Sequence, residues 1–353
     1  MGSVKDLTVI KAPTATEMGI GQFTFSDRYS VFDWGEMPDH IPYKGKALCF
    51  TSAYFFKQLE KAGIKTHYTN GGYAEPGSDS YFLGGIPSNK MTIKLVNMIR
   101  PDKKTSSIDD FLFYDYSKFQ DSELMNFLIP LEFIYRNGLP EGSSVFKRLK
   151  DGSLTIHDLG LDHEPQPGEV FAQPYFDVST KLEEGDRYLS WDEARKISGM
   201  TAREVKQLQE RMLYMNNIIS NSAEVAGMIN WDGKFEFAFD SNGELMVVDT
   251  LGILDESRFT YDGQHVSKEI NRQHYKRTQP EWVEQIDKAK KSGAYDWKSL
   301  VHEQPRPLPQ SLVDITSNMY ISAANALTNS KAFSAPPLGE VVCEYKKYLE
   351  TFE

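Results

Sequence analysis

Residues 230–259 carry the strongest short-range folding signal in this chain of 353 residues. Asn242 and Gly243 lie near the centre of the segment, and both residue types tolerate the positive φ angles of a type I′ turn. The segment is therefore predicted to be a β-hairpin with a two-residue loop. In that register Glu236 lies directly opposite Asp249, and the two carboxylates share one face of the sheet.

The opposed carboxylates predict a cation between them. Like charges directly opposite each other in a sheet repel, so the pairing is unfavourable unless a cation neutralises it. Hard divalent ions prefer carboxylate oxygens, and Glu236 and Asp249 are therefore expected to bind Mg²⁺. Lys234 falls on the same face, while the phenylalanines among residues 235–239 alternate onto the other face as core. The alternative is an ordinary exposed hairpin whose charges never meet.

The composition is that of an ordered globular protein. Hydrophobic residues make up 40% and aromatic residues 12%, which at this length is enough for two domains with real cores. The net charge of −11 argues against nucleic acid or an anionic membrane surface as the partner, because both would repel the protein. Any anionic ligand must therefore be held by local basic side chains and backbone N–H groups.

The sequence also predicts a cytoplasmic protein. It has no apolar signal region at the N-terminus and no run of about 18 apolar residues. Cys49 and Cys343 are far apart and lie in apolar sequence, so two buried thiols are expected in place of a disulfide. The sequence leaves open whether the chain forms a homo-oligomer.

Residues 1–126 are predicted to form a small β-rich domain. Residues 22–25 and 91–96 alternate between polar and apolar side chains as strands do. Thr51, with Ser52, is expected to cap a helix that ends at Gly63. The remaining stretches, rich in Gly, Ser, Asp and Lys, are expected to be loops: 69–90 and 100–125.

Residues 127–353 are predicted to form a larger α+β domain, entered through the apolar run 127–135. Ser190 and Thr201 each precede a glutamate by three residues, which is the capping-box pattern of a helix start. After Thr201 the apolar residues recur at helical spacing and should pack in the core: Val205, Leu208, Met212, Met215 and Ile219.

The last hundred residues are predicted to be helical with one interruption. A charged helix should begin at Ser267 and stop before Pro280, because proline cannot continue a helix. Residues 303–309 are expected to form an irregular tether, and the tail after residue 310 should hold at least one more helix.

Several polar segments could handle phosphates or carboxylates. Residues 2–6 could form a turn that cradles phosphates, or an exposed strand. Arg136 precedes a turn at residues 142–144 that suits a phosphate monoester, or it lies on an exposed strand before a surface turn. Residues 177–187, which include Lys181, could bind substrate or form a solvated loop. Residues 25–48 are dense in charge beside aromatics.

Other catalytic patterns are missing from the sequence. The seven histidines are scattered, and no Ser-His-Asp arrangement, complete Walker A loop or GxGxxG motif occurs.

These segments, taken together and in this order, resemble the SAICAR synthetase family, the purine-pathway ligases that join aspartate to a carboxyaminoimidazole ribonucleotide. The longer loops and the segment QHVSKEINRQHYKRTQPEWVE are most similar to the archaeal branch of that family. The matching pieces span residues 2 to about 260 and are these: GSVKD (2–6), SDRYSVFD (26–33), IPYKGKAL (41–48), PLEFIYR (130–136), EGSS (141–144), STKLEEGD (179–186), DGKFEFAF (232–239), VVD (247–249) and DESRF (255–259).

The resemblance implies a two-domain α+β fold, kinase-like or ATP-grasp-like, with antiparallel sheets and the nucleotide in a cleft between the domains. ATP would be the co-substrate, with Lys5 and Ser3 of the N-terminal loop at its phosphates and the stretch leading to Glu132 beside the adenine. Glu236 and Asp249 match the family's Mg²⁺ ligands, in agreement with the hairpin argument.

The resemblance also implies substrate contacts. Residues that match the binding site for the ribonucleotide's phosphate and ribose are Arg136, Ser143, Ser144 and Arg258. Lys234 and Asp232 fall where the family places charged groups near the reacting carboxylate. The segments that close over the substrates supply the expected aspartate side: Asp27, Arg28, Ser30 and the turn at residues 44–46.

The sequence departs from the family pattern at two positions. Ser3 replaces the first lysine of the phosphate loop, so Lys11 or Lys94 would have to supply the missing charge. Thr250 replaces the acidic residue after the metal-binding Asp249, which leaves the number of Mg²⁺ ions open.

The implied activity is an ADP-forming carbon-nitrogen ligase. It would phosphorylate the imidazole carboxylate and let the amine of L-aspartate displace phosphate. One rival is a ligase of the same fold that uses another amino acid or carboxylate. A rival of a different class, motivated by Ser3 and Thr250, is a degenerate nucleotide-binding regulatory protein.

Overall fold

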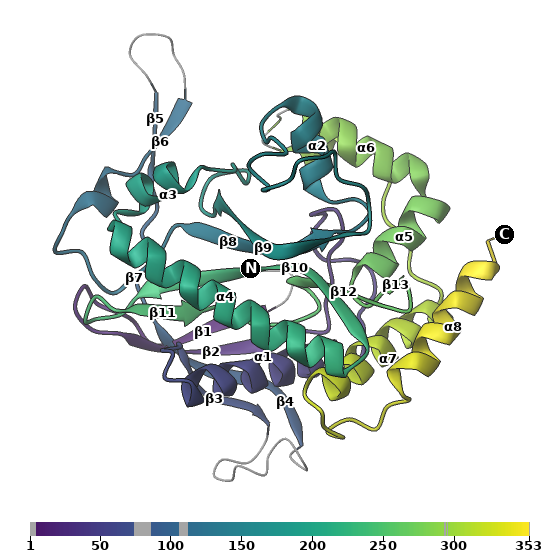
Figure 1. The fold of residues 1–353 in the computed structure, drawn as a ribbon. Coiled ribbons are helices and arrows are strands. Elements are labelled where there is room, and N and C mark those ends of the chain that lie inside the picture. Colours follow the sequence, from purple (N-terminus) through teal and green to yellow (C-terminus); the bar gives the residue numbers. More distant parts are fainter. Residues whose placement is uncertain (1–4, 74–85, 106–111, 293, 295, 353) are drawn as a thin grey trace.

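The computed structural model describes residues 5–73, 86–105, 112–292, 294 and 296–352. It contains two main antiparallel sheets with helices packed around them (Figure 1). The first sheet has the strand order β1-β2-β4-β3, and the second has the order β13-β12-β10-β8-β9 with β7 and β11 also paired to β10. Antiparallel sheets with separate helices make an α+β fold, as the sequence predicted.

The first sheet contains the two strands expected in the N-terminal region. In β2 the side chains alternate between buried and more exposed positions, which is why this stretch is stable as a strand covered on one face. The strands are β1 (Lys5–Lys11), β2 (Gly19–Phe25), β3 (Tyr68–Tyr73) and β4 (Pro87–Leu95).

Helix α1 (Lys44–Lys61) packs against β3 and β4 of this sheet. It starts at Lys44, so the expected start at Thr51 and Ser52 is wrong. Both residues are buried inside the helix, and the Ser52 hydroxyl accepts a hydrogen bond from the Leu251 N–H at 3.1 Å instead of capping α1. Gly63 follows the helix end with φ 75°, as a helix-terminating glycine does.

The two stretches expected to be loops contain regular structure. The first overlaps β3, which is paired to β4. The second contains a hairpin that projects from the body of the molecule (Figure 1). The hairpin consists of β5 (Asp102–Thr105) and β6 (Leu112–Asp115), and a short 3₁₀ helix (Ser117–Gln120) follows it.

The second sheet is built around β10 (Met228–Phe239). The first part of this strand pairs with β12 and β8, and its end pairs with β11 and β7. Strand β10 therefore pairs with different strands along its two halves and connects all of them in one sheet. The other strands are β7 (Phe127–Leu128), β8 (Leu131–Leu139), β9 (Glu169–Thr180), β11 (Leu245–Val248), β12 (Ser257–Tyr261) and β13 (Gln264–His265).

The helices between these strands start where the sequence predicts. Ser190 caps α3 (Trp191–Ser198), and Thr201 forms a complete capping box at the start of α4 (Ala202–Val225). Helix α4 packs on β10, and four of its five predicted core residues are buried while Val205 is partly buried. Helix α2 (Ser144–Asp151) follows β8.

The C-terminal region is helical, as expected. Helix α5 (Glu269–Thr278) stops before Pro280, which confirms the predicted end, and the same proline opens α6 (Pro280–Lys291), which the sequence analysis missed. After a 3₁₀ helix (Trp297–Leu300) and an irregular tether come α7 (Gln310–Leu327) and α8 (Leu338–Glu350).

One apolar core runs through both sheets, because α1 packs on the first sheet and on α7, α7 packs on α4, and α4 packs on β10 of the second sheet (Figure 1). The division at residue 126 falls between the two main sheets and stays a prediction.

The thiol prediction is half right. Cys49 is buried and Cys343 is exposed, and both are free. Within the described ranges no helix is long and apolar enough to cross a membrane.

Candidate active site

The hairpin forms, but its register differs from the prediction by one residue. Val248, not Asp249, lies opposite Glu236. The loop has three residues, since the Asp240 N–H donates to the Glu244 carbonyl at 2.9 Å. The Asp240 carboxylate also accepts the N–H groups of Asn242 in the loop and of Glu244 directly after it, and Gly243 takes φ 71° at the loop end. A longer loop stabilised by Asp240 therefore replaces the two-residue turn.

Glu236 and Asp249 nevertheless meet, by a different route. Asp249 has φ 70°, so the chain leaves the regular strand conformation directly after Val248. Burial raises the pKa of Glu236 to about 7, and the nearby Asp249 carboxylate adds to this rise. Burial would also raise the pKa of Asp249, but Lys5 and Lys181 hold it well below its usual value. The two carboxylates therefore influence each other, the predicted register is wrong, and their role as metal ligands stays a prediction.

Lysines and carboxylates alternate around this pair. Lys5 lies 2.8 Å from Asp249, and Lys181 lies 2.5 Å from Glu236 and 3.3 Å from Glu132. Lys234 lies 2.8 Å from Glu132 and 3.3 Å from Glu256. We call these residues the charged cluster: Lys5, Glu132, Lys181, Lys234, Glu236, Asp249 and Glu256.

The two central carboxylates suit Mg²⁺ only in part. Among the described residues no group of three or more His, Cys, Asp or Glu could hold a metal ion by itself. Mg²⁺, however, is usually bound by one or two carboxylates with phosphate oxygens and waters as the other ligands. Glu236 and Asp249 fit that pattern, with Lys5 and Lys181 as their ion-pair partners.

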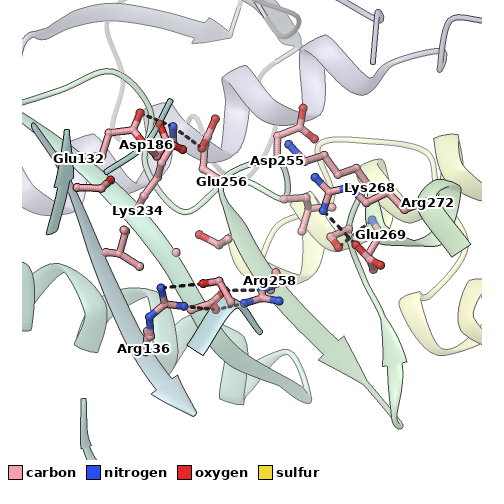
Figure 2. Close-up of a pocket in the computed structure, with 18 of the residues that line it drawn as sticks. Glu132, Arg136, Asp186, Lys234, Asp255, Glu256, Arg258, Lys268, Glu269 and Arg272 are labelled. Carbon is pink, nitrogen blue, oxygen red and sulfur yellow. Dashed lines mark hydrogen bonds and ion pairs between the residues drawn. The ribbon is translucent and has the colours of Figure 1, made fainter. Parts of the chain in front are cut away.

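A polar pocket of about 360 Å³ opens beside the charged cluster (Figure 2). Strands β8, β10 and β12 form one wall, and α5 with the segment before β12 forms the other. Of the residues predicted from the sequence, these line it: Glu132, Arg136, Ser144, Asp232, Lys234 and Arg258.

Asp232 connects the two arginines of the pocket. It lies opposite Arg136 on β8 and opposite Arg258 on β12, so the pairing of three strands brings the side chains together. The Arg258 Nε donates to Asp232 at 2.7 Å, and Arg136 lies 3.6 Å from the same carboxylate. Burial lowers the pKa of Arg258, but the bond to Asp232 more than offsets this and raises it.

Residues other than Asp232 also hold the Arg136 side chain. It donates to Asp177 at 3.2 Å and to the Tyr188 hydroxyl at 3.3 Å. Arg148 pairs with the same Asp177 and lies over the Tyr188 ring, 3.8 Å from its centroid. Only 3% of the Arg136 side chain is exposed, against 25% for Arg258. Of the two arginines beside Asp232, Arg258 is therefore the one more open to a ligand in the pocket.

The turn before α2 contributes one of its two predicted serines. Ser144 lines the pocket and lies 3.4 Å from Arg136. Ser143 is buried and caps α2, because its hydroxyl accepts the Val145 N–H. It therefore supports the turn and does not line the pocket.

The opposite wall contains charged residues that the sequence analysis did not assign. Asp255 pairs with Lys44 at 2.7 Å and accepts a hydrogen bond from Tyr320 at 2.5 Å. On α5, Arg272 pairs with Glu269 at 3.0 Å, and Lys268 lies one turn before Arg272 (Figure 2). Arg272 and Lys268 add positive charge to the pocket.

The predicted aspartate-side segment lies outside the pocket. The Asp27 carboxylate accepts the Gly45 N–H at 2.9 Å, and Arg28 pairs with Asp6 at 2.7 Å. The Ser30 hydroxyl accepts a backbone N–H at 3.1 Å. Residues 44–46 are not a turn: they open α1, and Lys44 is fully buried against Asp255. These local bonds explain why the segment is dense in charge.

The predicted ATP side has fewer described groups. Ser3 lies outside the described residues. Lys11 pairs with Glu17 on the surface at 3.1 Å. Lys94 lines a second hollow of about 340 Å³ together with Met18 and Met246. These two methionines belong to a packed apolar group that we call the apolar cluster: Met18, Val96, Leu128, Ala238, Met246 and Val248.

Spacing on α5 could have indicated the missed cations. Lys268 and Arg272 are four residues apart, so one helix face carries both. The sequence predicted this helix but gave no sign of which surface it would face. Asp255 and Glu256 fall within the DESRF motif, where only the arginine was assigned.

The fold and the pocket define a class of α+β proteins in which cationic and acidic side chains together line a polar pocket beside the second sheet. The family model for SAICAR synthetase matches residues 14–290. A putative phosphoribosylaminoimidazole-succinocarboxamide synthase from Archaeoglobus fulgidus is 45% identical over 351 residues, covering 99% of this chain and 100% of the relative. The synthase from Thermoplasma acidophilum is 32% identical over 316 residues, covering 88% and 93%.

Solved structures agree on the fold. The SAICAR synthase from Saccharomyces cerevisiae, complexed with SAICAR, superimposes with a TM-score of 0.63 at 22% identity, covering 95% of each chain. A SAICAR synthetase in complex with ADP gives a TM-score of 0.52 at 21% identity, covering 87% of this chain and 99% of that one. The chain belongs to the SAICAR synthetase family, which confirms the family and fold expected from the sequence.

Proposed function

We propose that this chain catalyses the ATP-dependent joining of L-aspartate to the carboxylate of 5-amino-4-carboxyimidazole ribonucleotide in de novo purine synthesis. The observation that carries the proposal is the position of the charged cluster directly beside the pocket that contains Arg258. Phosphoryl transfer and substrate binding then occur next to each other. The expected partners are the small-molecule substrates, and the expected location is the cytoplasm.

The reaction has two steps. A carboxylate oxygen of the ribonucleotide attacks the γ-phosphorus of ATP, ADP leaves, and an acyl phosphate forms. The aspartate amine then attacks the acyl carbon, phosphate leaves, and the attacking nitrogen loses one proton to water or a nearby base, which gives the amide. Positioned cations stabilise charge on the transferring phosphoryl group, so no protein nucleophile is needed. Lys234 and Asp232 lie on the pocket wall where the reacting carboxylate would meet the charged cluster.

We assign Mg²⁺ to Glu236 and Asp249. Their carboxylates are close enough to affect each other's protonation, and Lys5 and Lys181 keep the site from being a buried excess of negative charge. The ion would neutralise phosphate charge when bound with ATP. Lys5 and Lys181 are then free to contact phosphate oxygens. Thr250 donates its hydroxyl to Asp249 at 3.2 Å, so it supports this ligand where the family has an acidic residue.

The 5′-phosphate of the ribonucleotide is assigned to Arg258, Ser144 and the N-terminus of α2. A guanidinium fork and helix N–H groups together suit a phosphate monoester. Arg258 makes the direct contact because it is the more exposed arginine. Arg136 contributes its charge from behind and holds Asp232 in place.

The aspartate side is assigned to Lys268 and Arg272. Both line the pocket on the wall opposite Arg258 and lie within one turn of α5. An amino acid with two carboxylates needs two cationic partners, and this wall supplies them. The assignment replaces the one to residues 27–46, which bond elsewhere.

ATP is assigned to the region beside the apolar cluster. The adenine would lie against this cluster, because Val248 leads directly from it to Asp249. Lys94 lines the adjoining hollow and could contact the nucleotide. Glu132 connects the adenine side with the pocket through Lys181 and Lys234.

Dependence on each substrate tests the proposal. Purified protein is incubated with ATP and Mg²⁺, with and without the ribonucleotide and L-aspartate, and ADP, phosphate and the amide product are measured. The expected result is product and sustained phosphate release only when both are present. Turnover with a different amino acid or carboxylate in place of either would favour the ligase rival, and nucleotide binding without turnover would favour the regulatory rival.

A further inference from the structure

The backbone at Asp249 is the least regular part of the charged cluster. Asp249 is a non-glycine residue with φ 70°, a conformation that side chains with a Cβ rarely adopt. The conformation is necessary for the site, since the register of β11 would otherwise direct the Asp249 side chain away from Glu236. Such irregular backbone persists only where surrounding contacts hold it.

One side chain bonds to the backbone at this residue. The His67 ring lies with its Nε2 3.1 Å from the Asp249 carbonyl oxygen. A carbonyl only accepts, so Nε2 carries the proton and donates. His67 is buried, and its ring packs edge-on against Phe23 and Phe56 at centroid distances of 5.8 and 5.3 Å.

The His67 backbone is fixed as well. Its N–H donates to the Val247 carbonyl at 2.9 Å, and its carbonyl accepts the Lys94 N–H at 2.7 Å. The preceding residue, Thr66, forms a parallel bridge with Val247. His67 therefore joins the first sheet to β11 two residues before Asp249.

We propose that His67 is a positioning residue for the metal-binding carboxylate: its ring holds the Asp249 carbonyl so that the carboxylate faces Glu236. The inference rests on the proposed function, in which Glu236 and Asp249 hold Mg²⁺ with ATP. His67 itself touches no substrate.

A histidine suits this role because its ring N–H donates to the carbonyl while the ring packs between Phe23 and Phe56. The arrangement matches the general finding that groups hydrogen-bonded behind metal ligands set their orientation.

The test compares four variants. His67→Gln keeps an N–H donor at a similar reach, His67→Leu removes it, and His67→Asn keeps an amide that is too short to reach the carbonyl. Phe56→Leu is the control, because it loosens the packing around His67 without touching Asp249. The readouts are the increase in unfolding temperature on adding ADP with Mg²⁺, and the Mg²⁺ concentration for half-maximal turnover.

We expect His67→Leu and His67→Asn to lose most of the Mg²⁺-ADP increase and to need roughly tenfold more Mg²⁺, the size of effect known for groups behind metal ligands. His67→Gln should stay within about threefold of the parent on the same scale. Phe56→Leu should lower the unfolding temperature of the free protein and keep the ligand increase.

Other outcomes overturn the proposal. A normal Mg²⁺-ADP increase in His67→Leu, or in His67→Asn if the leucine variant does not fold, would mean that the ring only packs. A parent protein that is stabilised by Mg²⁺-ADP but forms no amide would refute the proposed function and leave the His67 comparison intact. A parent that shows no Mg²⁺-dependent ADP binding would refute both.

Discussion

The two sides of the site are held by different kinds of backbone. On the phosphate side, Asp232, Arg136 and Arg258 are direct neighbours across paired strands, so regular hydrogen bonding fixes their positions. On the metal side, Asp249 follows the end of β11 in a left-handed conformation and is held by Lys5 and His67 from the first sheet. The first side depends on one sheet and the second on contact between two.

This difference has a consequence for how each side responds to change. Many backbone hydrogen bonds hold the paired strands together, and these bonds remain when one side chain is changed. Substitutions on the phosphate side should therefore affect ligand binding and leave the fold intact. The metal side depends on single contacts, such as the Ser52 hydroxyl that accepts the Leu251 N–H. Substitutions there should affect the position of residues 249–256 as a group.

The largest effect is expected at the metal-side carboxylates. Asp249→Asn and Glu236→Gln should each lower turnover by at least about a hundredfold, because even groups behind metal ligands account for 10–100-fold. Without Mg²⁺, Glu236→Gln should change the free energy of unfolding by only a few tenths of a kcal/mol, since it loses both the Lys181 pair and the repulsion by Asp249.

Ligand-dependent stability separates this explanation from a structural one. Adding ATP with Mg²⁺ should raise the unfolding temperature of the parent and raise that of both variants much less. If Glu236→Gln unfolds easily without metal, the carboxylate is a structural hydrogen-bond acceptor and the metal assignment is wrong.

The next largest effect is expected at the buried pair of Lys44 and Asp255, which fixes the segment between β11 and β12. Lys44→Met should lower the free energy of unfolding by about 3–5 kcal/mol, because it leaves the buried Asp255 carboxylate without its ion-pair partner. The double variant with Asp255→Asn should recover part of that loss in denaturant titrations. A loss no greater than for an exposed pair, about 1 kcal/mol or less, would contradict the role of this pair.

The Lys44–Asp255 pair also predicts the direction in which stability changes with pH. Burial would raise the pKa of Asp255, but Lys44 and Lys268 hold it below its usual value. A carboxyl with a depressed folded pKa contributes stability above its unfolded pKa of about 3.9 and loses it as pH falls through the folded value. The parent should therefore lose stability below about pH 4 more steeply than Asp255→Asn does, as measured by unfolding temperature.

The contrast between the two sides also explains what the sequence could predict. The helix starts at Ser190 and Thr201 follow from local capping. The burial of Phe235 and Phe237 in the core follows from the alternation of side chains along the strand. The meeting of Glu236 with Asp249 was predicted for the wrong reason. The hydrogen bonds that Asp240 makes in the loop decide the register. Turn propensities favour a two-residue loop at Asn-Gly and do not account for such side-chain bonds.

Residues 25–48 show what a density of charge does not predict. Their density of charge is real, but Arg28 and Asp27 serve local bonds, and Lys44 is buried through a contact with a residue more than 200 positions away. Long-range pairing of this kind leaves no trace in spacing or composition. For the same reason Lys268 and Arg272 could be placed on a helix but not in the pocket.

A tenfold effect is expected on the phosphate side. Arg258→Lys keeps the charge and loses the two-pronged geometry, so the KM for the ribonucleotide should rise about tenfold, which corresponds to about 1.4 kcal/mol. The KM for aspartate should change little. Because the strands hold this wall, the unfolding temperature should stay near that of the parent. An unchanged KM for the ribonucleotide would remove Arg258 from the phosphate site.

The smallest effect is expected on the aspartate wall. Lys268→Ala and Arg272→Ala should each raise the KM for aspartate several-fold and leave the KM for the ribonucleotide near the parent value. An exposed charged contact is worth about 0.2–1 kcal/mol, and a partly desolvated one somewhat more. Arg28→Ala is the matched control, because it removes a cation that pairs with Asp6 outside the pocket. If Arg28→Ala raises the KM for aspartate and the α5 variants do not, the loop assignment is right, and the wall opposite Arg258 has a structural role.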